Sequence, residues 1–91
     1  MKITVKLWGP LKHLSQKDSC ELTLSKKSNL TELVQLLAKE EESIADFLVD
    51  EKGTPVKSTI ICINSQQYVW GTETELCESD DIILMSPIAG G

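Results

Sequence analysis

Polar and apolar residues alternate with a period of two in two stretches near the start of the sequence. Residues 2–8 (KITVKLW) show this alternation until a glycine-proline pair ends it, and residues 21–25 repeat it. Such alternation is typical of half-buried strands, so we predict two strands joined by a loop. Trp8 falls on the face opposite Leu7, which is an unusual place for so large an apolar side chain.

Apolar residues then recur at helical spacing. Asn29 can cap a helix, and Glu32 stands where its side chain can reach back to the cap. We therefore predict a main helix that starts after Asn29, followed by a short second helical segment over residues 43–48 and a turn over residues 52–55. The apolar stripe of the main helix consists of Leu30, Leu33, Val34, Leu36 and Leu37.

The second half of the chain predicts further strands. Residues 59–64 form a continuous apolar run, which is typical of a strand buried on both faces, and Cys62 within it is expected to behave as a small buried hydrophobe. Residues 64–67 are expected to form a turn and residues 68–70 a short strand. Residues 82–86 are expected to form the last strand, which a proline stops.

This order of elements predicts an α+β domain: a mixed sheet with one main helix packed on one face and a short second helix. In such a sheet the first and last strands commonly lie side by side at the centre. We expect the domain to span residues 1–86, with residues 87–91 as a flexible tail that leaves it from a fixed point.

Composition and charge exclude several classes of function. The 91 residues include nine lysines and no arginine, against 14 acidic residues, for a net charge of −5. Nucleic-acid binding, which relies on phosphate neutralisation and bidentate arginine contacts, is therefore not expected. No apolar run is long enough to span a bilayer and no signal sequence opens the chain, so we expect a cytoplasmic protein without membrane contact. The three cysteines lack metal-ligand spacing, and no disulfide or metal site is expected.

The sequence closes on Pro87-Ile88-Ala89-Gly90-Gly91. Paired glycines have no side chains to pack and lose more conformational entropy on ordering than other residues. They stabilise a fold poorly but suit a chain end that threads through a narrow channel of a partner. The alternative is a frayed terminus without a role.

Three stretches resemble the ubiquitin-like β-grasp sulfur carriers, most closely the small subunits of molybdopterin synthases. They are residues 7–12 (LWGPLK), residues 61–64 (ICIN), and residues 76–91, which carry the closing turn, strand and diglycine. The resemblance runs nearly end to end. One difference is Ser79, which stands in the closing turn where the family usually has a glycine.

The resemblance implies a β-grasp (ubiquitin-like) fold and a mechanism. A ubiquitin-activating-type adenylyltransferase would use ATP to convert the Gly91 carboxylate into an acyl-adenylate, and a sulfur donor would convert that into a thiocarboxylate. The sulfur would pass to a pterin precursor held by the large catalytic subunit of molybdopterin synthase, in a heterotetramer. The chain would bind no cofactor or metal itself and would have no active site of its own, so that it would act as the non-catalytic sulfur donor of the complex. The lone His13 has no serine or cysteine at catalytic spacing.

The candidate site residues are Gly91, as the site of adenylation and thiocarboxylation, and Gly90 beside it. The candidate partner contacts are Trp8, Lys12, Met85, Pro87, Ile88 and Ala89. Core packing is the alternative for Trp8 and Met85, and a merely solvated lysine is the alternative for Lys12. Exposed aromatic and methionine side chains are enriched at protein interfaces.

Three functions remain open from the sequence. The first is the pterin-directed sulfur carrier. The second is a carrier for another product, such as thiamine, an amino acid or thiolated tRNA, or a ubiquitin-like modifier that forms isopeptide bonds. The third is a β-grasp interaction module whose glycines are incidental.

Overall fold

In the part of the chain that the structure describes, five strands form one mixed sheet in the order β2-β1-β5-β3-β4. The computed structural model describes residues 1–56, 59–68 and 75–85. Among the described strands only the central β1–β5 pair is parallel, and its neighbours pair antiparallel. The first and last strands therefore lie side by side, as predicted. The strands are β1 (Lys2–Trp8), β2 (Ser19–Thr23), β3 (Ile60–Ile63), β4 (Gln66–Gln67) and β5 (Ile82–Met85).

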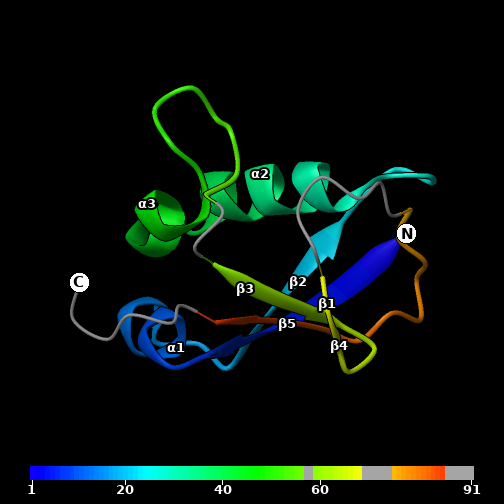
Figure 1. Ribbon diagram of the computed structural model, residues 1–91, viewed down its shortest axis with the longest axis horizontal. Coiled ribbons are helices and arrows are strands. Elements are labelled where there is room, and N and C mark those ends of the chain that lie inside the picture. Colours follow the sequence, from blue (N-terminus) through cyan, green and yellow to red (C-terminus); the bar gives the residue numbers. More distant parts are fainter. Residues whose placement is uncertain (57–58, 69–74, 86–91) are drawn as a thin grey trace.

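The main helix packs on one face of this sheet, which confirms the predicted α+β layout (Figure 1). α2 begins with the predicted capping box: Glu32 N donates to Asn29 Oδ1 at 2.9 Å, and Asn29 N donates to Glu32 Oε1 at 3.3 Å. The expected second segment is a 3₁₀ turn followed by α3. The helical elements are α1 (Pro10–Ser15), α2 (Leu30–Glu40), η1 (Glu42–Ile44) and α3 (Ala45–Leu48).

The core lies between α2 and the sheet. The alternation in β1 places every second residue under α2, and these side chains are fully buried while their neighbours are exposed. Apolar side chains from the other strands and the helices complete the core. The largest fully buried side chains are Ile3, Leu7, Leu11, Leu22, Leu30, Leu33, Leu37, Ile44, Leu48, Ile61, Ile82 and Leu84.

The segment between the first two strands is a helix rather than the predicted loop. Gly9 adopts φ 63° and ψ −136°, a conformation open mainly to glycine, and turns the chain sharply out of β1. Pro10 then occupies the first helical position, where its missing N–H costs nothing. The glycine-proline pair therefore ends the strand as predicted, but it also begins α1, which buries Leu11.

The bounds of two strands differ from the sequence prediction. β2 begins two residues earlier, because the antiparallel register with β1 extends to Ser19 opposite Lys6. The turn after β3 is tight: Asn64 and Ser65 both have positive φ, so β4 starts at Gln66 and not at the predicted residue 68. Residues 69 and 70 of the predicted strand lie outside the described residues.

The prediction that residues 59–64 form a strand buried on both faces is wrong. Within β3 only Ile61 is buried, and Cys62 is half-buried. The reason is that α2 covers one face of the sheet, whereas the side chains of Ile60 and Cys62 lie on the other. The buried cysteine is instead Cys20, on the covered face of β2.

Hydrogen bonds join the turn after β3 to the turn that precedes β5. Asn64 Nδ2 donates to Asp80 Oδ1 at 3.0 Å, and Asn64 Oδ1 accepts from Asp81 N at 2.9 Å. Asp80 Oδ2 also accepts from Cys77 N at 2.8 Å. Ser79 does not have positive φ, so this turn does not require the glycine that the family usually carries there.

Candidate functional site

The last rung of the sheet, meaning its last set of directly paired residues, consists of Trp8, Met85 and Ile60. Trp8 of β1 pairs with Met85 of β5, and Met85 pairs on its other side with Ile60 of β3. All three side chains lie on the face that α2 does not cover, which we call the open face. Beyond this rung β1 turns away at Gly9, so the paired strands end together next to Met85.

The exposure of Trp8 excludes a core position for it. Trp8 is 50% exposed, whereas the adjacent Leu7 has no exposed surface. Met85 is half-buried between its two neighbours. Single exposed apolar side chains are common on protein surfaces, whereas a contiguous exposed apolar patch marks an interaction site. Both side chains therefore lie at the surface of the domain, and their role as partner contacts stays a prediction.

The next rung adds residues that the sequence reasoning missed. Ile83 of β5 pairs with Lys6 on one side and with Cys62 on the other, and Ile83 and Cys62 are half-buried. Apolar runs in β3 and β5 put apolar residues on both faces, although a helix covers only one. The apolar runs do not reveal which face is covered, so only the register identifies Ile60, Cys62 and Ile83 as surface residues. We call Trp8, Ile60, Cys62, Ile83 and Met85 the apolar patch.

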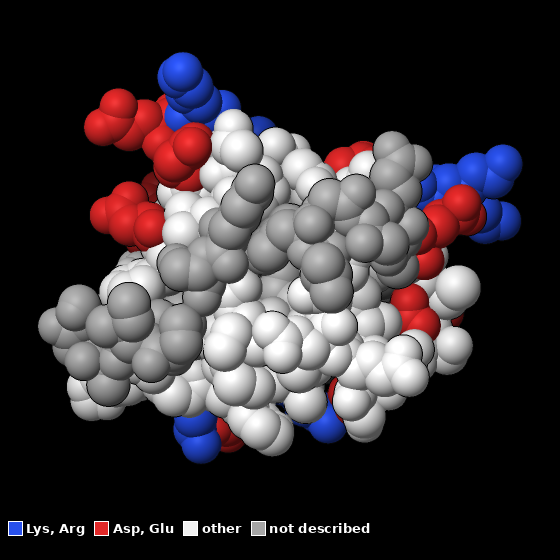
Figure 2. All heavy atoms as spheres, in the orientation of Figure 1, with Lys and Arg blue, Asp and Glu red and all other residues white. Residues whose placement is uncertain are grey.

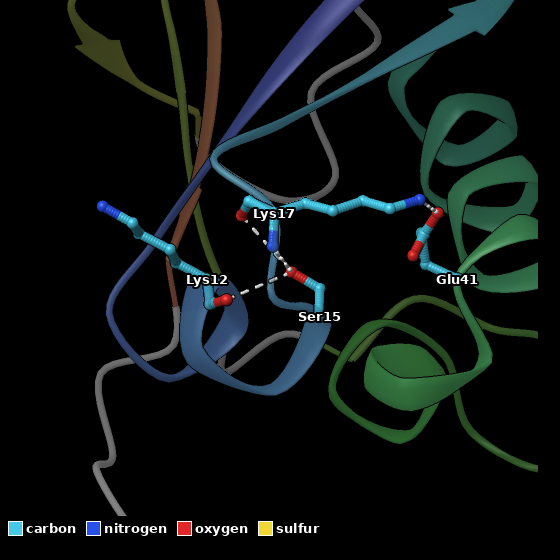
Figure 3. A network of polar contacts seen from close by, with 4 residues as sticks. All are labelled: Lys12, Ser15, Lys17 and Glu41. Carbon is cyan, nitrogen blue, oxygen red and sulfur yellow. Dashed lines mark hydrogen bonds and ion pairs between the residues drawn. The ribbon is translucent and has the colours of Figure 1, made fainter.

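Lys12 lies on α1 and not on the open face. Its Nζ atom is 2.9 Å from Asp18 Oδ1, and in Figure 3 its side chain points away from Lys17 and Glu41. It belongs to the rim of a shallow hollow beside α1. This hollow is lined by Gly9, Lys12, His13, Gln16, Lys17 and Asp18.

A second ion pair ties the segment after α1 to the end of α2. Lys17 Nζ donates to Glu41 Oε2 at 2.6 Å (Figure 3). The hydrogen bond and the charge of Glu41 raise the pKa of Lys17 above its ordinary value. Lys17 therefore stays protonated at neutral pH, and its charge is compensated within the chain.

The predicted reactive end of the chain lies outside the described residues. Pro87, Ile88, Ala89, Gly90 and Gly91 all fall in the range 86–91, which follows β5 directly. Six residues span at most about 20 Å when extended. Gly91 is therefore separated from Met85 by at most about that length of chain.

The three cysteines occupy different environments. Cys20 is buried, Cys62 half-buried and Cys77 exposed. Burial, together with the charge of Glu41, raises the pKa of the Cys20 thiol, which disfavours the reactive thiolate. Among the described residues, no group of His, Cys, Asp or Glu side chains could hold a metal ion.

We expect Cys77 to react with a thiol reagent such as iodoacetamide in the native protein before Cys20 does. Exposure gives the reagent access to Cys77, while burial and the raised pKa protect Cys20. Peptide mass mapping after timed alkylation measures the order, and unfolding in denaturant should remove the difference. Rapid labelling of Cys20 in the native state would contradict the described packing.

Comparisons with known proteins point to one fold. No protein-family model matches the chain, and no curated protein sequence matches it significantly. Among solved structures, SAMP1 from Haloferax volcanii superposes with a TM-score of 0.82 at 14% identity, over 100% of both chains. Urm1 from Trypanosoma brucei gives 0.74 at 29% identity, over 99% of this chain and 95% of that one.

A third neighbour occurs in a complex. The structure is described as a protein–protein complex of subunits 1 and 2 of the molybdopterin-converting factor from Helicobacter pylori. It matches with a TM-score of 0.61 at 18% identity, over 100% of both chains. These matches confirm that the chain has the ubiquitin-like β-grasp fold, which it shares with archaeal modifier proteins, Urm1 and molybdopterin-converting factor subunit 1.

In the part of the chain that the structure describes, no helix is long and apolar enough to cross a membrane. The predicted domain boundary after residue 86 falls outside that part. The candidate site among the described residues is therefore the exposed apolar patch on a β-grasp sheet. One of its members, Met85, directly precedes the segment that ends in two glycines.

Proposed function

We propose that this chain is a sulfur carrier whose Gly91 carboxylate is activated by a partner and converted into a thiocarboxylate for molybdopterin synthesis. The observation that supports it most is the last rung of the sheet. Trp8, Met85 and Ile60 form an exposed apolar row, and Met85 immediately precedes the six residues that end in Gly90-Gly91. A partner that holds this row would have the reactive end within reach.

The chemistry requires an activating partner because a carboxylate is a poor electrophile. An oxygen of the Gly91 carboxylate attacks the α-phosphorus of ATP on a ubiquitin-activating-type adenylyltransferase, and pyrophosphate leaves. A hydrosulfide ion then attacks the acyl carbon and AMP leaves, and loss of the sulfur-bound proton gives a thiocarboxylate on Gly91. The chain supplies the acyl group and the docking surface, and ATP stays a substrate of the partner.

Molybdopterin as the destination is supported by the resemblance in the closing strand and tail. It is also in keeping with the Helicobacter pylori neighbour, whose structure contains the second subunit of the same factor. The corresponding partner of this chain would be the large catalytic subunit of a molybdopterin synthase. That partner would hold the pterin precursor that receives the sulfur.

A ubiquitin-like modifier is the second candidate. It is favoured by the neighbours that are described as small archaeal modifier proteins, with TM-scores of 0.82 and 0.78. A lysine amine of a target protein would then attack the acyl carbon of the adenylate, and an isopeptide bond would form as AMP leaves. Both candidates share the first step and differ in the nucleophile that displaces AMP.

We expect ATP-dependent exchange of one terminal oxygen for sulfur when the protein is incubated with its activating enzyme, ATP and a sulfur donor. Intact-mass analysis detects the thiocarboxylate, and a reaction without ATP is the control. If the enzyme is active on ATP and the mass does not change, the carrier function is wrong. Isopeptide-linked products in place of the thiocarboxylate would favour the modifier.

A further inference from the structure

A shallow groove lies on the helical side of the domain, meaning the side of α2 and α3 opposite the open face. It is bounded by α2, by the end of α3 and by the loop over residues 50–54. Its lining is mainly apolar and includes Leu36 and Ala38 of α2, Ala45 of α3, and Val49 directly after α3. Except for Ala38 these residues are half-buried, so the groove offers apolar surface for contact.

Hydrogen bonds fix the shape of the loop that forms one wall of this groove. Asp50 Oδ1 accepts from Lys52 N and from Thr54 N, both at 2.9 Å. Gly53 has a φ of 82°, and its carbonyl oxygen accepts from Gln35 Nε2 of α2 at 2.8 Å. The loop is thereby tied to the helix. A ligand would not have to order it first, which lowers the entropic cost of binding.

Most of the net charge of the chain is carried by the segment around this groove. Residues 39–52 contain six acidic residues against two lysines, Lys39 and Lys52, and so account for −4 of the net charge of −5. Glu41 is compensated by its ion pair with Lys17. The other five acidic side chains are exposed and form no ion pair with a described residue. They are Glu40, Glu42, Asp46, Asp50 and Glu51.

Three of these acidic residues lie at the edge of the groove. Asp46, Asp50 and Glu51 line a second hollow, which shares Ala45 and Val49 with the groove. In Figure 2 acidic side chains gather at the upper left, over α3 and the loop that follows it. We call Asp46, Asp50 and Glu51 the acidic rim. An apolar groove and uncompensated negative charge therefore lie side by side on the helical side.

We propose that the groove and its acidic rim bind a basic segment of a partner protein. An apolar side chain of the segment fills the groove, and flanking lysine or arginine side chains meet the rim. Nucleic acids and anionic membranes carry the same sign of charge as the rim and are repelled by it. The surface lies opposite the open face, so this partner leaves Trp8 and Met85 uncovered. The proposal does not depend on the chemistry of Gly91.

A metal ion and a second copy of the chain match this surface less well. Among the described residues, no group of His, Cys, Asp or Glu side chains could hold a metal ion. Most homodimers pair the same patch of both subunits. Such a dimer would place one acidic rim against the other, whereas a basic segment compensates the charge of the rim.

Titration with designed peptides tests the chemistry of the ligand. The probe is a short fluorescein-labelled peptide of lysine and leucine residues, and fluorescence anisotropy measures its binding to the full chain. We expect saturable binding that weakens as the NaCl concentration rises, because salt screens exposed charge pairs. A peptide with serine in place of leucine is expected to bind about fivefold more weakly or worse, since it loses the apolar contact. A peptide with glutamate in place of lysine should not bind.

Two matched double variants test the location. Asp46→Asn with Glu51→Gln removes two charges of the rim and is expected to raise the dissociation constant of the lysine–leucine peptide about fivefold or more. Glu75→Gln with Glu78→Gln removes the same charge near the start of α2, where Glu75 forms a bridge with Asn29. This control is expected to change the dissociation constant less than about twofold. Circular dichroism checks that both variants fold.

Several results would overturn the proposal. The rim variant and the control could bind the peptide equally well, or the leucine-free peptide could bind as tightly as the probe. If Trp8→Ala weakens binding and the rim variant does not, the peptide occupies the open face.

Other occupants have results of their own. If CaCl₂ displaces the peptide where NaCl of equal ionic strength does not, and only with an intact rim, the rim is a cation site and the proposal is wrong. If the free protein sediments as a dimer that Leu36→Ala dissociates, a second copy occupies the groove and the proposal is equally wrong. Thiocarboxylation is measured separately by mass, so none of these results decides the carrier function.

Discussion

Adding one alanine after Gly91, or replacing Gly90 by valine, is expected to slow adenylation about 100-fold or more, because displacements of about 1 Å at a reacting group cost this much. The added alanine moves the carboxylate one residue beyond the position where ATP is held. Valine keeps the length but adds a branched side chain where a channel would close around the backbone. Both changes lie beyond β5, so the fold should be unaffected.

ATP–pyrophosphate exchange with the activating enzyme measures this step directly. Lys39→Ala is the matched surface control, because Lys39 is exposed near the end of α2, on the helical side, and should leave the exchange rate unchanged. Thermal unfolding should give the parental midpoint for all variants. Exchange at the parental rate with either tail variant would show that the tail is not threaded, and the reading of the glycines as incidental would gain support.

Local signals that agree with tertiary packing made part of the fold predictable. β1 carries an uninterrupted alternation and α2 carries both a capping box and an apolar stripe, and both elements occur where the sequence places them. The central β1–β5 pairing followed from the order of elements. These are cases in which pattern, propensity and burial point to the same structure.

Other elements could not be predicted because the same residues support two structures. The Gly9-Pro10 pair ends a strand and equally begins a helix, and only the packing of Leu11 into the core decides for α1. Likewise an apolar run does not reveal which of its faces a helix covers. Cys62 was therefore predicted to be buried and is half-buried, while Cys20 is buried.

The candidate site was predictable only where the local sequence pattern was enough to place a residue on the open face. Trp8 is an apolar residue at a solvent-facing position of the alternation in β1, so its place on the open face could be predicted from the sequence. Ile60 and Ile83 could be recognised only once the register had placed them beside Met85 and Cys62, because pairing across the sheet is non-local.

Leu7 and Trp8 are adjacent in β1 but lie on opposite faces of the sheet, so we expect their replacement to affect stability differently. Leu7→Ala is expected to lower the free energy of unfolding by about 2–5 kcal/mol, because it leaves a cavity at a fully buried position. Trp8→Ala is expected to cost about 1 kcal/mol, since the side chain is half exposed and leaves no enclosed cavity. The free energy of unfolding should therefore depend on Leu7, and the affinity for the partner on Trp8.

Urea unfolding followed by circular dichroism measures both free energies, and a binding titration with the activating enzyme completes the comparison. Leu7→Ala should bind with nearly parental affinity at temperatures where it remains folded, because its side chain does not reach the open face. Trp8→Ala should be nearly as stable as the parent but bind weakly. If Trp8→Ala were as destabilising as Leu7→Ala, the indole would belong to the folded core and the open face would lose its anchor.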